Sequence, residues 1–481
     1  MVEYWQANIR GLYKSNESLM KRLSKNLLSL FSADMARRLL GFISVAYLAR
    51  VLGKEGFGAV NLGFAVLAYV MVFSAAGFPT FGTKKIAQGE TPELIGSVIG
   101  SRMIATMMVV LVVSSVVLTT VQISSFAWLL ILFSCAVLPQ IFFVDWFFQG
   151  KETLGIVSAA RVMQAMVYLG VVLLFVRTIN DIRWVAIGSI AGEGVASVLL
   201  FIRFRIQYPD AHIRIKPSLS LMKHSIPLAM GIVLTTLIIN YPLLALGIFT
   251  TTSNVGIFSA ASKVVYFLLM GDRILVLLLL PASARKYSDS PETFNRMLTD
   301  ALRWILIISL PLAVGGILTA NKLIAIIYGV EYSSSVAVFQ VFIWYFFVTM
   351  LHTVYSAGLI GVGGDKSYGK IMLVTAFVCL VSVTAGVCLF GAIGAAFGVV
   401  ISEGISVWLM KLSLQRIIPL YPPEKILRVI LSVAIMGGCV TVVIPYGLMW
   451  GILFGVGCYS LLLILFRAVV WNDVKILLAR F

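Results

Sequence analysis

The sequence predicts an all-α polytopic membrane protein with about fourteen transmembrane helices, arranged as two pseudo-symmetric six-helix bundles followed by two C-terminal helices. Hydrophobic residues make up 60% of the 481 positions and charged residues only 12%, about half the ~25% that is usual for soluble domains. The mean hydropathy is +1.01, and an internal repeat relates two parts of the chain. A soluble fold of this length would need far more polar surface, so a soluble enzyme is excluded.

Apolar runs bounded by charged or turn-forming residues define the individual spans. A helix needs roughly 20 apolar residues to cross the hydrocarbon core of a bilayer. The predicted spans are 26–48, 57–80, 96–119, 126–148, 154–176, 184–203, 225–249, 255–281, 302–320, 336–361, 369–391, 393–413, 426–446 and 449–470. Few residues remain between these spans, so no large domain outside the membrane is expected.

Lysine and arginine concentrate in alternate connecting segments, which predicts the orientation of the chain. If the N-terminus is inside the cell, the basic stretches 1–25 and 203–223 and the basic C-terminal end are all cytoplasmic. The outer segments then contain few basic residues, so the positive-inside rule places both termini of this multi-pass protein on the cytoplasmic side of the cell membrane. The same bias explains the net charge of +17, so nucleic acid is not an expected partner. No cleavable signal peptide is expected.

Two pairs of segments reveal the internal repeat. Residues 151–155 resemble 365–369, and residues 187–194 resemble 397–404. The repeat unit has an even number of spans, so both copies enter the membrane from the same side, as in transporters with a cavity between two bundles. Chance similarity between glycine-rich helices is the alternative. The repeat predicts a cytoplasmic segment 1–25, an N-lobe 26–215, a C-lobe 216–420 and an additional helix pair in 421–481.

Ionisable side chains inside the spans are the candidate site residues. Each costs about 2.5–3.5 kcal/mol at the bilayer centre, so such residues usually face protein or water. Asp34 can reach Arg37 or Arg38 one helical turn away, but its single charge cannot neutralise both. Because a guanidinium donates two parallel hydrogen bonds, these arginines suggest a cationic cavity that receives a pyrophosphate. Alternatively, they pair with Asp145 and Glu193 and only hold helices together.

Further cations extend the candidate substrate site. Arg161 lies deep in the fifth predicted span, and Lys263 can supply a matching charge from the second half of the chain. Asp272 and Arg273 are neighbours, so they point about 100° apart on a helix and cannot simply neutralise each other. The predicted substrate-binding residues are Arg37, Arg38, Arg161, Lys263 and Arg273.

The acidic residues in the spans are candidates for ion coupling or for structural ion pairs. This group consists of Asp34, Asp145, Glu193, Asp272 and Glu403. Glu193 and Glu403 are the best candidates for coupling to a proton or sodium gradient or to the membrane potential, because burial disfavours the charged form of a carboxylate. The alternative is that each of these two glutamates braces its own bundle through hydrogen bonds.

Other polar residues point less clearly to a site. Arg102 and Arg303 lie near the cytoplasmic starts of spans and are expected to extend towards the membrane interface. Four uncharged residues can hydrogen-bond sugar hydroxyls or join neighbouring helices: Gln140, Gln164, Asn240 and Tyr241. The three histidines, which are His212, His224 and His352, lack the spacing of metal ligands and are interpreted as loop or packing residues. The five cysteines lie in apolar stretches, so no disulfide, metal site or cofactor is expected.

The segment after the first span resembles a family signature. Residues 47–58 read Tyr-Leu-Ala-Arg-Val-Leu-Gly-Lys-Glu-Gly-Phe-Gly. They are similar to the Leu-Ala-Arg-x-Leu-Gly-x-Glu-x-Phe-Gly pattern of polysaccharide repeat-unit flippases of the O-antigen or capsule type. These flippases belong to the multidrug/oligosaccharidyl-lipid/polysaccharide exporter superfamily. Residues 77–78, 85–87 and 281–282 continue the resemblance.

The resemblance implies a flippase that moves polyprenyl-pyrophosphate-linked oligosaccharide from the cytoplasmic to the outer leaflet by alternating access of two lobes. It also implies contact with membrane lipids and cooperation with a polysaccharide polymerase and glycosyltransferases. A lipid-linked peptidoglycan precursor flippase and a multidrug or cation antiporter of the same superfamily are alternatives. A membrane-embedded polymerase or glycosyltransferase is an alternative from another class, but such enzymes usually place their acid and base groups on a long loop at one membrane face. We therefore expect a transporter without catalytic residues.

Overall fold

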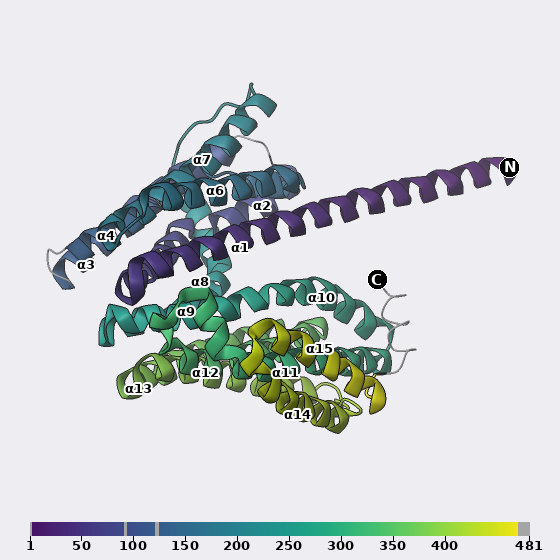
Figure 1. Cartoon of the computed structure of the whole chain (residues 1–481). Helices are drawn as coiled ribbons and strands as arrows, with labels where there is room; N and C mark the ends of the chain where they lie inside the picture. Colours follow the sequence, from purple (N-terminus) through teal and green to yellow (C-terminus); the bar gives the residue numbers. More distant parts are fainter. Residues whose placement is uncertain (1, 91–93, 121–124, 470–481) are drawn as a thin grey trace. The chain divides into compact units, whose positions relative to one another are not determined.

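The structure is a computed structural model that describes the backbone of residues 2–90, 94–120 and 125–469. The side chains of residues 1–32 and all residues beyond 469 lie outside the described part of the chain. The predictions made for segment 1–25 and for the basic C-terminal end therefore fall on residues that the structure does not describe. Throughout the described part of the chain, regular structure consists of helices and contains no strand (Figure 1).

Two compact units make up the chain. The first comprises Met1–Val51 and Gly63–Val233, and the second comprises Leu52–Leu62 and Leu234–Phe481. The division therefore falls within α8, and a short stretch of α1 belongs to the second unit. The predicted lobe limits of 26–215 and 216–420 stay a prediction.

The first unit contains most of α1 and the first part of α8. Its elements are α1 (Val2–Ala75), α2 (Phe78–Ala87), α3 (Leu94–Thr120), α4 (Ser125–Cys135), η1 (Leu138–Phe142), α5 (Asp145–Gly150), α6 (Leu154–Phe175), η2 (Ile179–Asp181), α7 (Arg183–Gln207) and α8 (Leu219–Phe249). The second unit adds α9 (Thr252–Leu268), η3 (Leu269–Gly271), α10 (Asp272–Asp289), α11 (Pro291–Tyr328), η4 (Val330–Tyr332), α12 (Ser335–Gly361), α13 (Asp365–Gln415), α14 (Ile426–Val443), η5 (Ile444–Tyr446) and α15 (Leu448–Leu465).

The predicted spans correspond closely to these helices. Within the described residues, 11 helices are long and apolar enough to cross a membrane. Two of them, α1 and α13, are interrupted at a glycine and each contains two predicted spans. The fourth predicted span corresponds to the shorter apolar helix Phe126–Phe142. The prediction of an all-α polytopic membrane protein with about fourteen spans is confirmed.

The two interruptions require glycine. Gly53 in α1 has φ 64° and Gly391 in α13 has φ 59°, a region in which a Cβ atom would clash with the backbone. In α13 the two halves then pack side by side, because Gly386 and Gly394 lie so close that a Cβ on Gly394 would be 1.8 Å from the Gly386 carbonyl oxygen. The glycine therefore turns one continuous helix into an antiparallel pair of membrane-crossing segments.

Gly58 of the family signature and Gly256 of α9 have a packing role in the second unit. A Cβ atom on Gly58 would lie 1.8 Å from the carbonyl oxygen of Thr252, and one on Gly256 would lie 2.0 Å from that of Lys54. The adjacent Phe57 is 1% exposed and packs against the rings of Tyr328 and Tyr332. This part of the signature thus brings the backbones of α1 and α9 into direct contact.

An aromatic cluster in the first unit positions the short helix α5. Trp146, Phe147, Phe148 and Phe204 are almost completely buried together. The hydroxyl of Thr83 in α2 donates to the Trp146 carbonyl oxygen over 3.1 Å. These contacts fix the start of α5, where Asp145 stands.

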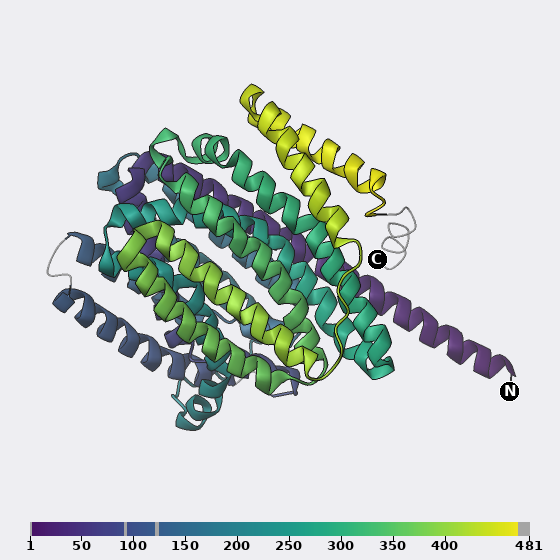
Figure 2. The same cartoon turned by 90° about the horizontal axis from the view of Figure 1, so that it is seen from below.

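The last two helices pack side by side within the second unit, as Figures 1 and 2 show in yellow. Apolar residues of α14 and α15 cover α11, and the Tyr459 hydroxyl donates to the Ile307 carbonyl oxygen over 2.8 Å. Large apolar side chains on the outer faces of the helices are strongly exposed, such as Leu111, Leu174 and Leu461 at 66–68%. An exterior of this kind suits contact with lipid tails rather than with water.

Candidate functional site

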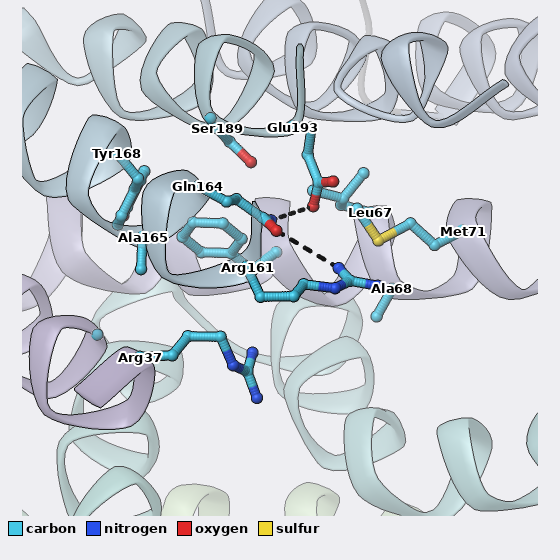
Figure 3. A pocket seen from close by; sticks show the side chains of 13 residues that line it. Arg37, Leu67, Ala68, Met71, Arg161, Gln164, Ala165, Tyr168, Ser189 and Glu193 are labelled. Carbon is cyan, nitrogen blue, oxygen red and sulfur yellow. Dashed lines mark hydrogen bonds between the residues drawn. The ribbon is translucent and has the colours of Figure 1, made fainter. Parts of the chain in front are cut away.

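A pocket of about 280 Å³ in the first unit contains the main candidate residues. Helices α1, α6 and α7 supply its walls, and Figure 3 shows it from close by. The lining residues are Arg37, Gly41, Phe64, Leu67, Ala68, Met71, Arg161, Gln164, Ala165, Tyr168, Ser189, Gly192 and Glu193. Two predicted substrate-binding arginines and one predicted ion-coupling glutamate therefore share one cavity.

Asp34 binds both arginines of the α1 triplet. Its Oδ1 atom accepts from Arg37 Nη2 over 2.9 Å, and its Oδ2 atom accepts from Arg38 Nε over 2.8 Å. One carboxylate therefore faces two guanidinium groups, which leaves a formal excess of one positive charge on this turn of the helix. Among the described lining residues, α1 contributes Arg37 but not Arg38. The Arg37 side chain is 42% exposed.

Arg161 is held in place by contacts from three directions. Its Nη2 atom lies 3.1 Å from Asp145 Oδ2, and its Nη1 atom donates to Gln164 Oε1 over 3.4 Å. The guanidinium carbon stands 4.2 Å from the centre of the Phe143 ring, a cation–π arrangement. Asp145 thus pairs with Arg161. Within the described residues it does not pair with Arg37 or Arg38, as the alternative of purely structural ion pairs had predicted.

Gln164 connects Arg161 to Glu193, as Figure 3 shows. Its Nε2 atom donates to Glu193 Oε1 over 2.5 Å. Glu193 is 4% exposed, and its Oε2 atom has no hydrogen-bond partner among the described residues. Gly192 permits this approach of α6 and α7, because a Cβ at that position would lie 2.8 Å from the Gln164 carbonyl oxygen.

Arg102 corrects an expectation from the sequence. It does not extend to the membrane interface but is 3% exposed. Its guanidinium donates to Gln140 Oε1 over 3.0 Å and to the Phe143 carbonyl oxygen over 3.4 Å. These two acceptors bind both terminal nitrogens of the buried guanidinium, while its Nε atom has no hydrogen-bond partner among the described residues. Arg102 also interacts electrostatically with Asp145 and Glu193, so it supports the charges around the pocket.

The candidate cations of the second half lie outside both described pockets. Lys263 is partly buried on α9, and Arg273 is exposed on α10. Arg303 donates to the Ala468 carbonyl oxygen over 2.5 Å. The Tyr241 hydroxyl bonds to the Thr384 hydroxyl and so joins α8 to α13, whereas the Asn240 amide donates to the Thr236 carbonyl oxygen within α8.

A second pocket, of about 340 Å³, brings together the acidic candidates Asp272 and Glu403 in the second unit. His352 lines the same pocket, and its Nδ1 atom lies 2.7 Å from Glu403 Oε1. From the sequence alone, His352 was interpreted only as a loop or packing residue. No spacing rule connects side chains from α10, α12 and α13, so the cluster becomes visible only in the folded unit. The described residues contain no group of three or more His, Cys, Asp or Glu side chains that could hold a metal ion.

Known proteins share both sequence and fold with this chain. A putative O-antigen transporter of Escherichia coli (strain K12) is 23% identical over 409 residues, which cover 81% of this chain and 95% of that protein. The lipid II flippase MurJ, in an inward closed conformation, superposes with a TM-score of 0.74 at 16% identity over 91% of this chain and 99% of its own. An inward-facing multidrug resistance MATE family transporter of the MOP superfamily gives a TM-score of 0.65 at 14% identity, over 79% of this chain and 94% of its own.

The two solved structures show the fold alone, because their sequence identities are low. All three relatives are transporters or flippases rather than enzymes, in agreement with the expectation for this chain. A family model described as "Polysaccharide biosynthesis protein" matches residues 23–285, which is more than half of the sequence. The chain therefore belongs to the polysaccharide biosynthesis protein family.

Proposed function

We propose that this multi-pass membrane protein is a flippase for polyprenyl-pyrophosphate-linked oligosaccharide repeat units, which it moves from the cytoplasmic to the outer leaflet. The observation that carries the proposal is the pocket of the first unit, where Arg37 and Arg161 stand among helices that can span a membrane. The similarity to a putative O-antigen transporter supports the same class of substrate.

The pocket has the chemistry that a pyrophosphate needs. Arg37 and Arg38 share one carboxylate, so an anion that approaches Arg37 meets an uncompensated positive charge. Guanidinium groups bind phosphate oxygens through paired, charge-assisted hydrogen bonds. Glu193 also lines the pocket, but both Arg161 and Arg102 act on it electrostatically. The opposing carboxylate is therefore balanced from its own side of the cavity.

The transport cycle in this proposal is alternating access of two lobes, in which the head group crosses the membrane and the lipid tail stays in the bilayer. A proton or sodium gradient or the membrane potential drives the cycle. Both chain termini face the cytoplasm, where glycosyltransferases build the repeat unit. A polysaccharide polymerase uses the flipped product on the outer side.

Arg37 and Arg38 form a matched pair for testing the proposal. Both bond to Asp34, but α1 presents only Arg37 to the pocket among the described lining residues. We expect Arg37→Ala to slow the flipping of a fluorescent undecaprenyl-pyrophosphate-linked oligosaccharide in proteoliposomes by about 10- to 100-fold. This range corresponds to the roughly 1.5–3 kcal/mol of a hydrogen bond to a charged group. Arg38→Ala should lose much less activity.

Membrane insertion of both variants is measured in parallel by fluorescent size-exclusion chromatography. Wild-type flipping by Arg37→Ala would contradict the phosphate site, and so would an equal loss in both variants. A wild-type protein that fails to flip the probe would contradict the flippase itself.

A further inference from the structure

The pocket of the second unit gathers three ionisable side chains from three helices. Asp272 comes from α10, His352 from α12 and Glu403 from α13, and all three line the same cavity of about 340 Å³. This cluster is separate from the arginine pocket, because each of the two pockets lies within a different compact unit. The proposed phosphate chemistry does not use it.

The three groups interact with one another electrostatically. His352 Nδ1 lies 2.7 Å from Glu403 Oε1, and the two side chains are only 15% and 8% exposed. Asp272 Oδ1 accepts a hydrogen bond from the Thr353 hydroxyl. Asp272 also interacts electrostatically with both His352 and Glu403. The imidazole therefore lies against one carboxylate and interacts electrostatically with a second one that lines the same pocket.

The other titratable groups that face this cluster are neutral near pH 7. Tyr266 of α9, Tyr345 of α12, and Tyr368 and Cys379 of α13 act on Glu403 or are acted on by it. α8 contributes Thr235, Ile238 and Ile239 to the lining. Among the described lining residues there is no lysine or arginine, so His352 supplies the positive charge available inside the pocket.

The charge of the cluster changes with a single proton. With both carboxylates ionised, the formal charge is two negative when the imidazole is neutral and one negative when the ring is protonated. Burial penalises the more highly charged state most strongly. Histidine is the side chain whose charge changes within the physiological pH range. Because His352 and Glu403 are in contact, protonation of the ring changes the interaction between the two side chains.

We propose that Asp272, His352 and Glu403 form a proton-binding site that takes up and releases one proton in each transport cycle. On uptake, the lone pair of an imidazole nitrogen forms an N–H bond while an O–H bond of hydronium breaks and leaves water; release is the reverse. Proton coupling of transport rests on the proposed flippase function, whereas proton binding can be tested without any substrate.

The low histidine content makes the binding step directly measurable. The sequence has three histidines, and the other two are exposed with Nδ1 against the carbonyl oxygens of Asp210 and Ser220. Replacing them, as His212→Asn and His224→Asn, leaves His352 as the single signal in ¹⁵N-histidine-labelled full-length protein in lipid bilayers. We expect the imidazole nitrogens of His352 to change between neutral and charged chemical shifts within about pH 5–9.

Two pocket variants and one matched control decide whether the cluster acts as a unit. Glu403→Gln should move the titration midpoint of His352 by about one pH unit or more, which corresponds to roughly 1.4 kcal/mol of interaction. Asp272→Asn should move it by less, because no contact between Asp272 and the ring as short as the one to Glu403 is present in the described structure. Glu424→Gln, an exposed carboxylate of the same unit, should leave the midpoint unchanged. A ring that keeps one charge state over the whole range, or a midpoint unaffected by Glu403→Gln, would overturn the site.

A transport assay then tests the coupling. In proteoliposomes with the fluorescent lipid-linked oligosaccharide, a pH gradient should accelerate flipping by wild-type protein several-fold, and substrate should move protons that a trapped pH dye detects. His352→Asn and Glu403→Gln should flip at the same rate with and without the gradient, while Glu424→Gln behaves as wild type. Gradient-stimulated flipping by His352→Asn, or stimulation of wild-type protein by a sodium gradient alone, contradicts proton coupling at this site. A wild-type protein that does not flip at all contradicts the flippase, and the imidazole titration still decides whether the proton site exists.

Discussion

Two aspartates of the first unit hold arginines in different ways. Asp34 binds Arg37 and Arg38 from its own helix and is 28% exposed. Asp145 is 11% exposed and accepts from Arg161 of α6, from the Trp146 backbone N–H and from the Gln149 side chain. Pairs within one helix are worth only a few tenths of a kcal/mol, so an anionic ligand can replace Asp34 at Arg37 at little cost. The buried Asp145 instead holds the Arg161 guanidinium in one position, where it is available to a ligand in the pocket.

Asp145→Asn should therefore destabilise the protein. The new amide would direct its NH₂ group at the Arg161 and Gln149 donors, or else at the Trp146 N–H, so buried donors lose an acceptor. Such a loss costs about 1–3 kcal/mol. We expect a clearly lower unfolding temperature in detergent, measured by intrinsic fluorescence. In the double variant with Arg161→Gln, part of the loss should be recovered, because neighbouring groups couple by about 0.5–3 kcal/mol.

Asp289→Asn provides the control for this measurement. Asp289 is 65% exposed and lies 3.8 Å from Lys286, and surface ion pairs contribute about 0–1 kcal/mol. Its unfolding temperature should stay close to the wild-type value. Equal effects of the two substitutions, or strictly additive effects of Asp145→Asn and Arg161→Gln, would contradict the role assigned to Asp145.

At the scale of helices, glycines decide where backbones meet. The signature Phe57-Gly58 and residues 255–256 face each other in the second unit, and neither glycine has room for a methyl group. The same principle recurs at Gly188 and Gly398, which the repeat aligns. Each packs against a valine of the preceding antiparallel segment, Val171 and Val383 respectively. The repeated sequence thus encodes repeated close helix contacts.

Gly58→Ala should disrupt the second unit more than its small volume suggests. The neighbours of the added methyl group are backbone atoms of Thr252 and Gly256, which cannot rotate away as a side chain would. Overpacking costs typically about 1–3 kcal/mol, and we expect a lower unfolding temperature and less protein in the membrane. Gly438→Ala is the matched control, since nothing lies within 4 Å of its added methyl group, and alanine favours a helix by up to about 1 kcal/mol. A Gly58→Ala protein as stable as Gly438→Ala would contradict the contact.

For the whole molecule, hydropathy and charge predicted much of the architecture. The spans, the helical class and the breaks between spans 1 and 2 and between spans 11 and 12 follow from local composition, which a bilayer constrains strongly. Arg37, Arg161 and Glu193 were all predicted as site residues, because charged side chains inside a membrane must face protein or water. The structure places these three in one pocket. Burial of Arg102 and the pairing of His352 with Glu403 could not be predicted, since each depends on side chains from other helices. The membership of Leu52–Leu62 in the second unit likewise depends on tertiary packing.

The orientation of the chain remains the most direct prediction at this scale. Basic residues gather in the connection between α7 and α8, whereas the connection between α11 and α12 carries Glu331 and no lysine or arginine. Translocating positive charge is unfavourable, so the first connection should be cytoplasmic and the second should face outward. Single cysteines introduced as Asp210→Cys and Ser333→Cys, both at exposed positions, report the two sides after the native cysteines are replaced by serine or alanine. A membrane-impermeant maleimide should label Ser333→Cys in intact cells and Asp210→Cys only after the membrane is opened. The reverse labelling pattern would show that the chain has the opposite orientation, and the proposed direction of flipping would then be reversed as well. Labelling of both positions in intact cells would contradict the predicted number of membrane crossings between them.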